Sequence, residues 1–418
     1  MERYTVPKFK PHDITVEVPA SKSILNRALL LAAFSKGTVR LRHGDYAEDT
    51  RALLACLREL GIQIERTSDG SIVHGGAPNR KATLNVMSAG TAARFLPVML
   101  AFCGGDYYFT ASEQMKRRPM EILSVLNRHG VKIEYFEQEE HFPFRLYSKG
   151  ICGNSMEIDT DKSTQYASGI MMAAANYGAP FRLRLKGSRI NSSYLAMTLT
   201  MLHDFHIPFT KADNEIVISP QTAPPPCYTV EPDLSGACYF YALSLLCACR
   251  VCVKGVQRCT MQGDFAFLRL LEERGVQLID SDDGLIADGA SVTCYAGFQN
   301  NMRDFSDQAL TVAALAPFAT SPTVLTGISH IRLQECDRIH AIEQNLKALG
   351  VPVTVDRDCI KIEPTLPHAT RIATYGDHRV AMAFSLLGLK IGNIVIEDPD
   401  CVKKTFDGFF SILNKITK

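Results

Sequence analysis

Cationic and hydroxyl side chains recur at the points where apolar helices are expected to begin. The first turn of a helix offers free N–H groups and a partial positive charge, which together attract anions. Capping is the simpler role for Ser21, Asp233 or Ser235 taken singly. It does not explain Lys and Arg at such ends, because the helix dipole repels cations there, whereas a bound anion would compensate them. The residues at these expected helix starts are Lys22, Ser23, Arg27, Gly90, Thr91, Arg94, Ser163, Thr164, Gln165, Asp377, His378 and Arg379.

Three more cations are expected at the openings of a second, amphipathic set of helices. Arg118, Arg338 and Lys404 each stand at the start of such a segment. If all of these helix ends face one cleft, the cleft suits a pair of ligands that carry phosphates and carboxylates together.

The amphipathic segments repeat along the chain. Each leads into a short strand, and its helical stretch ends at Gly61, Gly130, Gly275 or Gly350, with His206 in the equivalent place of one copy. Glycine readily supplies the left-handed residue that ends a helix. The intervals, in chain order, are 69, 76, 69 and 75 residues, and a shorter sixth copy follows.

The apolar helices repeat with nearly the same period. Their equivalent points are spaced 67, 74, 71, 73 and 70 residues apart. The two series together predict an α/β fold of six units, each with two helices and accompanying strands. Helices that are apolar on nearly every side should be buried, which places helices inside and sheet outside. The equivalent points are Ser23, Gly90, Thr164, Ser235, Gln308 and His378.

Length and composition favour a two-domain globular protein. A chain of 418 residues exceeds what one hydrophobic core supports, and the successive prolines of the segment TAPPP at 222–226 favour an extended connection between domains. Lys and Arg total 45 against 44 Asp and Glu, so the basic excess of a nucleic-acid binder is missing. No apolar run approaches the roughly 18 residues that span a bilayer. The first residues lack the apolar core of a signal peptide.

The cysteines predict neither a disulfide framework nor a metal site. Thirteen of them are scattered over the chain, which fits free thiols in a reducing cytoplasm. Cys247, Cys249 and Cys252 lie close together, but a zinc site would want a fourth ligand and usually a second paired element. Buried thiols are the simpler interpretation.

Eight short segments resemble, in order and spacing, the family of 5-enolpyruvylshikimate-3-phosphate synthases. They are SKSILNR from Ser21, AGTAARF from Ala89, RRP from Arg117, STQ from Ser163, SDQALT from Ser306, RLQECDR from Arg332, GDHR from Gly376 and DPDCVKKTF from Asp398. The resemblance runs from about residue 12 to the C-terminus and implies an inside-out α/β barrel pair with three βαβαββ units per domain. It places one domain at 13–226 and the other at 1–12 plus 227–418, with the active site in the cleft between them.

The resemblance also implies an activity, the transfer of the enolpyruvyl group of phosphoenolpyruvate to the 5-hydroxyl of shikimate 3-phosphate, in the pathway to chorismate and aromatic amino acids. No cofactor or metal is expected. The protein is expected to be a cytoplasmic monomer that glyphosate inhibits. Ser23 and Arg27 resemble the binders of the shikimate carboxylate. Ser163 and Thr164 resemble the contacts of the 3-phosphate, with Asn191 and Tyr194 beside them. The remaining residues implied at this substrate are Lys22, Gln165, Asp307, His330 and Gln334.

For phosphoenolpyruvate, the resemblance divides the cations between the two charged groups of the ligand. Arg338 and Arg379 resemble the pair that grips its carboxylate, for which planar guanidinium groups are suited. Arg118, Gln165 and Lys404 resemble its phosphate site, and Gly90 allows close backbone approach; Lys22 is also implied there.

Proton transfer falls to three residues. Asp307 is expected to act as base toward the 5-hydroxyl, and Glu335 and Lys22 are expected to serve the methylene carbon. Capping of an apolar helix is the simpler alternative for Asp307, and an exposed loop position is the simpler alternative for Glu335.

Five positions depart from the family pattern. Gln334 stands where Lys is usual, which removes one positive charge near the expected site. His330 and Ser88 stand where Asn is common, Phe95 where Pro or Leu is common, and Asn191 where Ser is common.

Two alternatives share the expected fold. A UDP-N-acetylglucosamine enolpyruvyl transferase would carry a reactive Cys six residues before Pro119, where this chain has Glu113. A non-catalytic relative that only binds phosphorylated metabolites is favoured by Gln334, but it would not need Lys22, Asp307 and Glu335. An ATP-dependent kinase is disfavoured further by the absence of a GxxxxGK[ST] phosphate loop.

Overall fold

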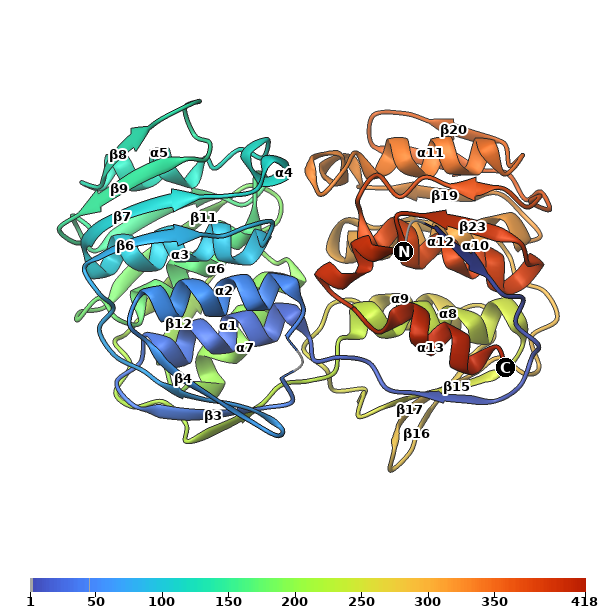
Figure 1. Cartoon of the computed structure of the whole chain (residues 1–418), viewed down its shortest axis with the longest axis horizontal. Helices are drawn as coiled ribbons and strands as arrows, with labels where there is room; N and C mark the ends of the chain where they lie inside the picture. Colours follow the sequence, from blue (N-terminus) through green and yellow to red (C-terminus); the bar gives the residue numbers. More distant parts are fainter. Residues whose placement is uncertain (1–2, 45) are drawn as a thin grey trace. The chain divides into compact units, whose positions relative to one another are not determined.

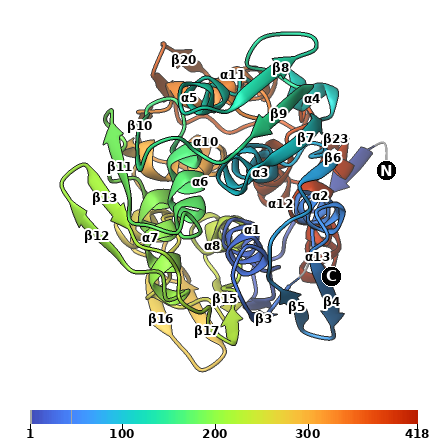
Figure 2. The same ribbon diagram turned by 90° about the vertical axis from the view of Figure 1, so that its left-hand side faces the viewer.

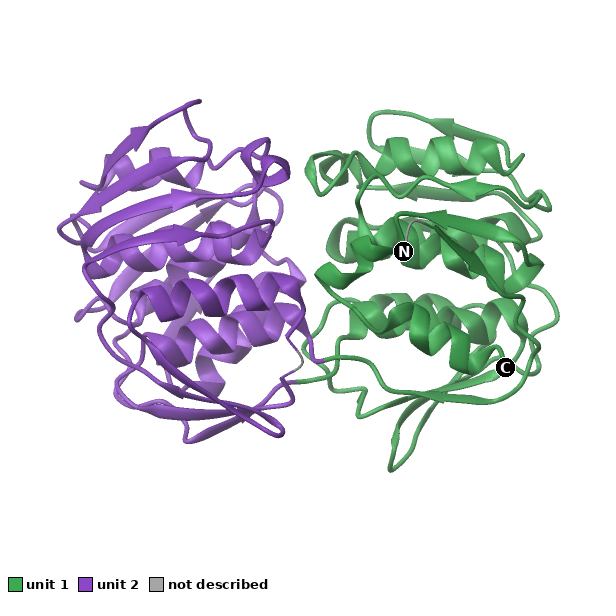
Figure 3. Ribbon diagram, viewed as in Figure 1, with its two compact units in different colours: residues 1–19, 231–418 green, residues 20–230 purple. Residues whose placement is uncertain are grey.

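The computed structural model describes residues 3–44 and 46–418, which form two compact units (Figure 3). Unit 2 is continuous, from Ala20 to Val230, whereas unit 1 combines Met1–Pro19 with Glu231–Lys418. Residues 1 and 2, which the sequence assigns to the second domain, lie outside the described residues. Within the described residues, no helix is long and apolar enough to cross a membrane.

Unit 2 contains three successive groups of strands and helices (Figure 1). Its elements are α1 (Lys22–Ala33), β3 (Thr38–Arg42), α2 (Glu48–Glu59), β4 (Gln63–Thr67), β5 (Gly70–His74), β6 (Lys81–Asn85), α3 (Gly90–Cys103), β7 (Gly105–Thr110), α4 (Glu113–Lys116), α5 (Ile122–Arg128), β8 (Lys132–Tyr135), β9 (Phe144–Ser148), β10 (Ser155–Asp159), α6 (Thr164–Ala174), β11 (Phe181–Lys186), α7 (Ser193–Asp204), β12 (Phe209–Ala212), β13 (Glu215–Ile218) and β14 (Cys227–Thr229).

Unit 1 follows a similar order and adds short 3-10 helices before or after several of its α-helices. Its elements are β1 (Arg3–Val6), β2 (Ile14–Val16), α8 (Leu234–Cys247), β15 (Arg250–Lys254), α9 (Phe265–Glu272), β16 (Gln277–Asp280), β17 (Gly284–Asp288), β18 (Gln299–Asn301), η1 (Arg303–Gln308), α10 (Ala309–Leu315), η2 (Ala316–Phe318), β19 (Thr323–Thr326), η3 (Ser329–Leu333), α11 (Arg338–Ala348), β20 (Val353–Val355), β21 (Cys359–Ile362), β22 (Arg371–Ile372), α12 (His378–Ile391), β23 (Ile394–Glu397), η4 (Pro399–Lys404) and α13 (Phe409–Ile416).

The strands form small mixed sheets of one recurring design. In the order β6-β7-β9-β8, for example, β6 and β7 run parallel, and β9 pairs antiparallel with both β7 and β8. A parallel pair needs a crossover connection, which the buried helix α3 supplies between β6 and β7. The same pattern holds for β10-β11-β13-β12 and β18-β19-β21-β20.

The most apolar helices of each unit are buried. All residues of α8 are buried, as are Ile24 to Ala33 of α1, because these stretches are apolar on almost every side. The strands instead alternate: in β11, Phe181, Leu183 and Leu185 are buried while the cationic residues between them are exposed. Figure 2, in which unit 2 faces the viewer, shows α1, α3 and α6 near its centre with strands around them. The predicted burial of the apolar helices is confirmed.

The domain boundaries predicted from the sequence are off by a few residues. Strand β2 pairs with β15, so residues up to Pro19 belong to unit 1 rather than to the domain predicted to begin at 13. Strand β14 pairs with β3, so unit 2 continues past 226 to Val230. The boundary at 12/13 was expected from the family resemblance and the one at 226 from the proline segment, and neither shows the pairing between distant strands that decides where a unit ends.

Candidate active site

Most of the predicted helix starts are where the sequence places them. Lys22 and Gly90 are the first residues of α1 and α3, and His378 is the first residue of α12. Two side chains also act as caps: the Ser163 hydroxyl accepts a hydrogen bond from the Gln165 backbone N–H, and Asp377 accepts one from the N–H of Arg379. Polar side chains therefore gather at ends that carry a partial positive charge.

Two of the predicted positions need correction. Arg118 does not open an amphipathic helix, because α4 ends at Lys116 and α5 begins only at Ile122. Pro119 follows Arg118 and disfavours a helical conformation in the residue before it. Lys404 closes the 3-10 helix η4 instead of opening α13, which begins at Phe409. Both cations thus lie in connecting segments.

In unit 2, Lys22 has an anionic partner that the sequence did not reveal. Its Nζ lies 3.0 Å from Oδ2 of Asp49, a residue in the first turn of α2 that is only 3% exposed. Nearby, the Asn26 amide donates to the Thr91 hydroxyl at 2.6 Å, which links α1 to the start of α3. Nothing local in the sequence indicates which cation Asp49 contacts.

Arg27 is buried beneath the start of α1. Its Nη1 donates to the backbone carbonyl of Ser23 at 2.9 Å, and its Nε donates to the Thr198 hydroxyl at 2.9 Å. The guanidinium carbon lies 5.1 Å from the ring centroid of Phe95 and 5.9 Å from that of Tyr194. Burial lowers the pKa of the Arg27 guanidinium to about 10, against an opposing effect of Tyr194. The group is therefore a cation held by neutral partners.

The remaining predicted residues of unit 2 lie at the starts of α6 and α7 and near α3. Asn191 accepts a hydrogen bond from Lys211 at 3.1 Å, and the Ser88 and Ser112 hydroxyls lie 2.7 Å apart. A Cβ added to Gly90 would meet Nη1 of Arg118 at 3.4 Å and Nη1 of Arg94 at 3.7 Å. Two guanidinium groups thus lie close to the first turn of α3, where an anion would meet both charge and backbone N–H groups.

Unit 1 brings the predicted acids and cations into one ion-pair network. Arg338, 1% exposed, places Nη1 at 2.9 Å from Oδ1 of Asp307 and Nε at 2.7 Å from Oδ2 of Asp377. Its Nη2 lies 3.5 Å from Oε2 of Glu335, and Nη1 also donates to the side-chain carbonyl of Gln334. Burial alone would lower the pKa of Arg338, but the three carboxylates outweigh it and raise that pKa above its usual range.

Two further cations complete the network. Arg379 places Nη2 at 3.0 Å from Oδ2 of Asp307, and Lys404 places Nζ at 3.0 Å from Oε1 of Glu335. Asp307 is therefore bound on both carboxylate oxygens by arginines, and Glu335 by Arg338 and Lys404. The side chains of both acids are largely buried, at 16% and 13% exposed. Such a set can exchange its own carboxylates for those of a ligand, which would leave the two acids to handle protons.

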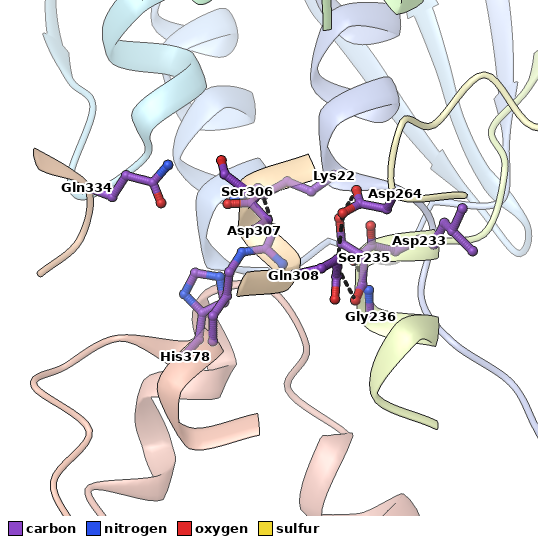
Figure 4. Close-up of polar contacts among 12 residues, drawn as sticks. Lys22, Asp233, Ser235, Gly236, Asp264, Ser306, Asp307, Gln308, Gln334 and His378 are labelled. Carbon is purple, nitrogen blue, oxygen red and sulfur yellow. Dashed lines mark hydrogen bonds and ion pairs between the residues drawn. The ribbon is translucent and has the colours of Figure 1, made fainter. Parts of the chain in front are cut away.

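The structure answers both simpler alternatives for the acids. Asp307 lies inside η1 and caps no helix, and Glu335 is largely enclosed by its ion pairs. Ser306, the residue before Asp307, forms a hydrogen bond with His330, whose Nε2 lies 2.8 Å from the serine hydroxyl. Figure 4 shows Ser306, Asp307 and Gln308 in succession along this segment.

Two acids of this region were not recognised from sequence. Asp377 was identified only as part of a helix start, although its carboxylate is the closest acidic partner of Arg338. Asp264 was not identified at all; it lies just before α9 and accepts hydrogen bonds from Ser235 and Gln308. Ser235 thus donates its side chain to Asp264 rather than capping α8, a role that Asp233 fills. Among residues 3–44 and 46–418, no three His, Cys, Asp or Glu residues are grouped so as to hold a metal ion.

Nearly the whole chain is similar to proteins of one kind. Residues 7–413 match the family model described as EPSP synthase (3-phosphoshikimate 1-carboxyvinyltransferase). The chain is 36% identical over 420 residues to the 3-phosphoshikimate 1-carboxyvinyltransferase of Nostoc punctiforme, with 98% of each chain covered. It is 35% identical over 424 residues to the protein of that name from Trichormus variabilis, again with 98% of each covered. The solved EPSP synthase of Acinetobacter baumannii shares the fold, with a TM-score of 0.82 at 24% identity over 99% of this chain and 98% of that one.

Proposed function

Because the chain belongs to the EPSP synthase (3-phosphoshikimate 1-carboxyvinyltransferase) family, we propose that it transfers the enolpyruvyl group of phosphoenolpyruvate to the 5-hydroxyl of shikimate 3-phosphate. The products are 5-enolpyruvylshikimate 3-phosphate and phosphate. The chain is accordingly an enzyme of the transferase class, and its place is in the shikimate pathway.

The ion-pair network of unit 1 supports this proposal most directly. Phosphoenolpyruvate carries a carboxylate and a phosphate, and the network holds two arginines and a lysine against three acids, Asp307, Glu335 and Asp377. Arg338 and Arg379 bind its carboxylate in place of Asp307, and Lys404 binds its phosphate in place of Glu335. Each exchange replaces one anion by another, so no cation is left buried without a partner.

Unit 2 supplies the other binding groups in this proposal. Ser163, Thr164 and Gln165 at the start of α6 bind the 3-phosphate, together with Asn191 and Tyr194, and the α6 dipole favours that anion. Ser23 and Arg27 bind the shikimate carboxylate. Arg118 and Gly90 receive the phosphate of phosphoenolpyruvate. His330 and Gln334 of unit 1 are the proposed contacts to the acceptor hydroxyls.

The proposed reaction is an addition followed by an elimination. Asp307 takes the proton of the 5-hydroxyl while the hydroxyl oxygen adds to C2 of phosphoenolpyruvate. The methylene carbon receives a proton from Glu335 or Lys22. The tetrahedral intermediate then returns a methyl proton to that group, and the C2–O bond to phosphate breaks. Both substrates must meet for the addition step. We therefore propose that the binding groups of unit 1 and those of unit 2 act on the same pair of substrates.

The finer description of fold and assembly is also a proposal. Five runs of the order strand, helix, strand, helix, strand, strand, with 3-10 turns and α4 added in some runs, and buried helices support an inside-out α/β barrel pair of six units. A monomer that needs no nucleic acid or membrane partner is the simplest assembly for a reaction between two small molecules.

A phosphate-release assay with shikimate 3-phosphate and phosphoenolpyruvate tests the activity. Release that needs both substrates, and that UDP-N-acetylglucosamine cannot support in place of shikimate 3-phosphate, is expected. The nucleotide-sugar reaction is disfavoured because Glu113, the first residue of α4, pairs with Lys116 where that chemistry requires a thiol. Release with the nucleotide sugar alone as acceptor would reverse the assignment.

A further inference from the structure

Asp264 is a buried acid for which the proposed reaction has no use. Asp264 is 8% exposed and lies immediately before α9, at the end of the connection from β15. Its Oδ2 accepts a hydrogen bond from the Ser235 hydroxyl at 2.7 Å, and its Oδ1 accepts one from Nε2 of Gln308 at 2.9 Å (Figure 4). One carboxylate therefore joins the starts of α8 and α9 to the segment that carries Asp307. Burying an ionised acid costs free energy unless hydrogen bonds or ion pairs compensate its charge.

Gln308 is fixed on both ends of its amide. Its Oε1 accepts a hydrogen bond from the Thr311 hydroxyl at 2.8 Å, while its Nε2 is engaged by Asp264. Gln308 is also fully buried and follows Asp307 directly. A side chain held so closely fixes the backbone next to it, and with it the base of the side chain of Asp307.

The segment around Asp307 needs such an anchor because it is not a regular helix. Phe305 has φ −138° and ψ 41°, which interrupts η1 two residues before Asp307. Regular helical hydrogen bonding therefore does not by itself set the position of the Asp307 carboxylate. The bond from Gln308 to Asp264 provides a fixed point on its C-terminal side.

Charge adds a second connection between the two acids. Burial raises the pKa of Asp264, and the negative charge of Asp307 raises it further, whereas Arg379 and the bonds from Ser235 and Gln308 lower it. Cys238 is a further titratable group near this carboxyl, and both Asp264 and Asp233 act on the thiol of Cys238. Two carboxylates that interact in this way titrate as a pair, so each makes the other easier to protonate.

We propose that Asp264 is a positioning residue for the reaction: through Gln308 it holds the Asp307 carboxylate in place, and its negative charge lies behind that base. This inference rests on the proposed function, in which Asp307 accepts the proton of the acceptor hydroxyl. Among the described residues, the hydrogen bonds of the Asp264 carboxylate go to Ser235 and Gln308 and not to the cations proposed to bind phosphoenolpyruvate. Its effect should therefore fall on turnover and on pH dependence, not on substrate affinity.

The substitution Asp264→Asn tests the charge, because it keeps the size and an acceptor oxygen for Gln308 but removes the charge; Gln308→Met tests the bridge. We expect kcat to fall about tenfold, a fraction of the ~10²–10⁴ that proton transfer contributes, with the KM for phosphoenolpyruvate little changed. Loss of a nearby negative charge favours ionised Asp307, so the acid limb of the kcat–pH profile should move to lower pH. Asp282→Asn, at an exposed position of the β16–β17 hairpin, is the matched control and should leave both quantities unchanged.

The outcomes separate the two proposals. An unmodified protein without activity would overturn the proposed function and this inference with it. An active protein whose Asp264→Asn variant keeps its kcat and its acid limb would overturn this inference alone. If that variant does not fold, Gln308→Met removes the bridge while it retains the charge of Asp264. Its kcat should fall about tenfold at unchanged KM, and an unchanged kcat would overturn the positioning role.

Discussion

The cations proposed to bind phosphoenolpyruvate already have anionic partners within unit 1. Arg338 contacts Asp307, Glu335 and Asp377, and Lys404 contacts Glu335. Removing one partner from a buried pair costs about 3–5 kcal/mol because it leaves the other charge uncompensated. A ligand that brings its own anions avoids that cost and releases Asp307 and Glu335 from their cations. In the proposed reaction the acids thus have two roles at different times, as counter-ions first and as proton carriers once substrate is bound.

Replacing Glu335 by Gln should separate turnover from binding. The substitution keeps the shape of the side chain but removes its ionisable proton, so kcat should fall by roughly 10²–10⁴. Affinity for phosphoenolpyruvate should hold or improve, because Lys404 loses the anion that competes with the substrate phosphate. Steady-state kinetics and calorimetric titration measure the two effects. Glu343→Gln on α11, which removes the pair with Lys347, is the control. Affinity that drops as steeply as kcat would make Glu335 a binding residue.

Replacing Gly90 by Ala should weaken glyphosate more than phosphoenolpyruvate. The added methyl group would lie 3.4 Å from Nη1 of Arg118, which is tight but leaves room for a small shift. Overpacking of this kind costs about 1–3 kcal/mol, and the longer inhibitor should bear more of it than the shorter substrate. The inhibition constant of glyphosate should rise roughly five- to 150-fold, with a smaller rise in KM. Phe95, fully buried one turn further along α3, is the residue whose bulk could already have changed this pocket. Unmodified enzyme that resists glyphosate would show that this pocket is already reshaped.

At the scale of the elements, buried polar bonds tie the central helices of unit 2 together. Arg27 of α1 donates to the Thr198 hydroxyl of α7, and that hydroxyl donates in turn to Ser168 of α6 at 2.9 Å. Thr198 is fully buried. A buried cation whose acceptor is removed is costly, so this chain of bonds fixes both the register of three apolar helices and the position of Arg27.

Thr198→Val should therefore destabilise unit 2. Valine has nearly the same shape but cannot accept the bond from Nε of Arg27, and an unsatisfied buried donor costs about 1–3 kcal/mol. Urea unfolding, monitored by far-UV circular dichroism because the chain has no tryptophan, gives the change in the unfolding midpoint. Thr200→Val on the same helix is the matched control, because Thr200 is exposed and bonds only its own helix at Ala196. Equal midpoints for the two variants would show that Arg27 does not depend on Thr198.

What the sequence could and could not predict follows from the range of the forces involved. Helical periodicity and terminal glycines are local, so the repeats and the starts of α1, α3, α6 and α12 were predicted well. The irregular paths at Arg118 and Lys404 depend on Pro119 and on the packing of η4, and both were misplaced. The roles of Asp49 and Asp264 depend on contacts between distant segments, which no spacing in the sequence reveals. The substrate roles of the site residues stay predictions.

At the scale of the whole molecule, the thirteen cysteines divide by burial. None is in a disulfide, and all thirteen lie within the described residues. Cys152, Cys227, Cys259 and Cys294 are exposed. The three neighbouring cysteines predicted as buried thiols are indeed buried: Cys247, Cys249 and Cys252. Burial raises the pKa of Cys56 and of Cys249 to about 12. A thiol reacts as its thiolate, so these buried groups should be inert at ordinary pH.

A native thiol titration at pH 8 should therefore count four fast-reacting cysteines, and unfolding should release all thirteen. Raising the pH to 9 should not add to the fast class, because the raised pKa values of Cys56, Cys103 and Cys401 still lie well above it. Peptide mapping of the labelled protein assigns the sites. Early labelling at Cys249 would mean that the α8–β15 connection opens in the native state.

The strand partners of β2 and β14 have a consequence for the order in which the protein can be made. Unit 2 is continuous from Ala20 to Val230, so all of its strands, β14 included, have emerged from the ribosome before most of unit 1 exists. The start of the chain fares differently: β2 must wait for β15, and β1 must wait for β23 at Ile394–Glu397. The first strand to be synthesised is thus among the last to be placed: nascent chains must keep β2 unpaired until β15 has been made and β1 unpaired until nearly the whole protein has been translated.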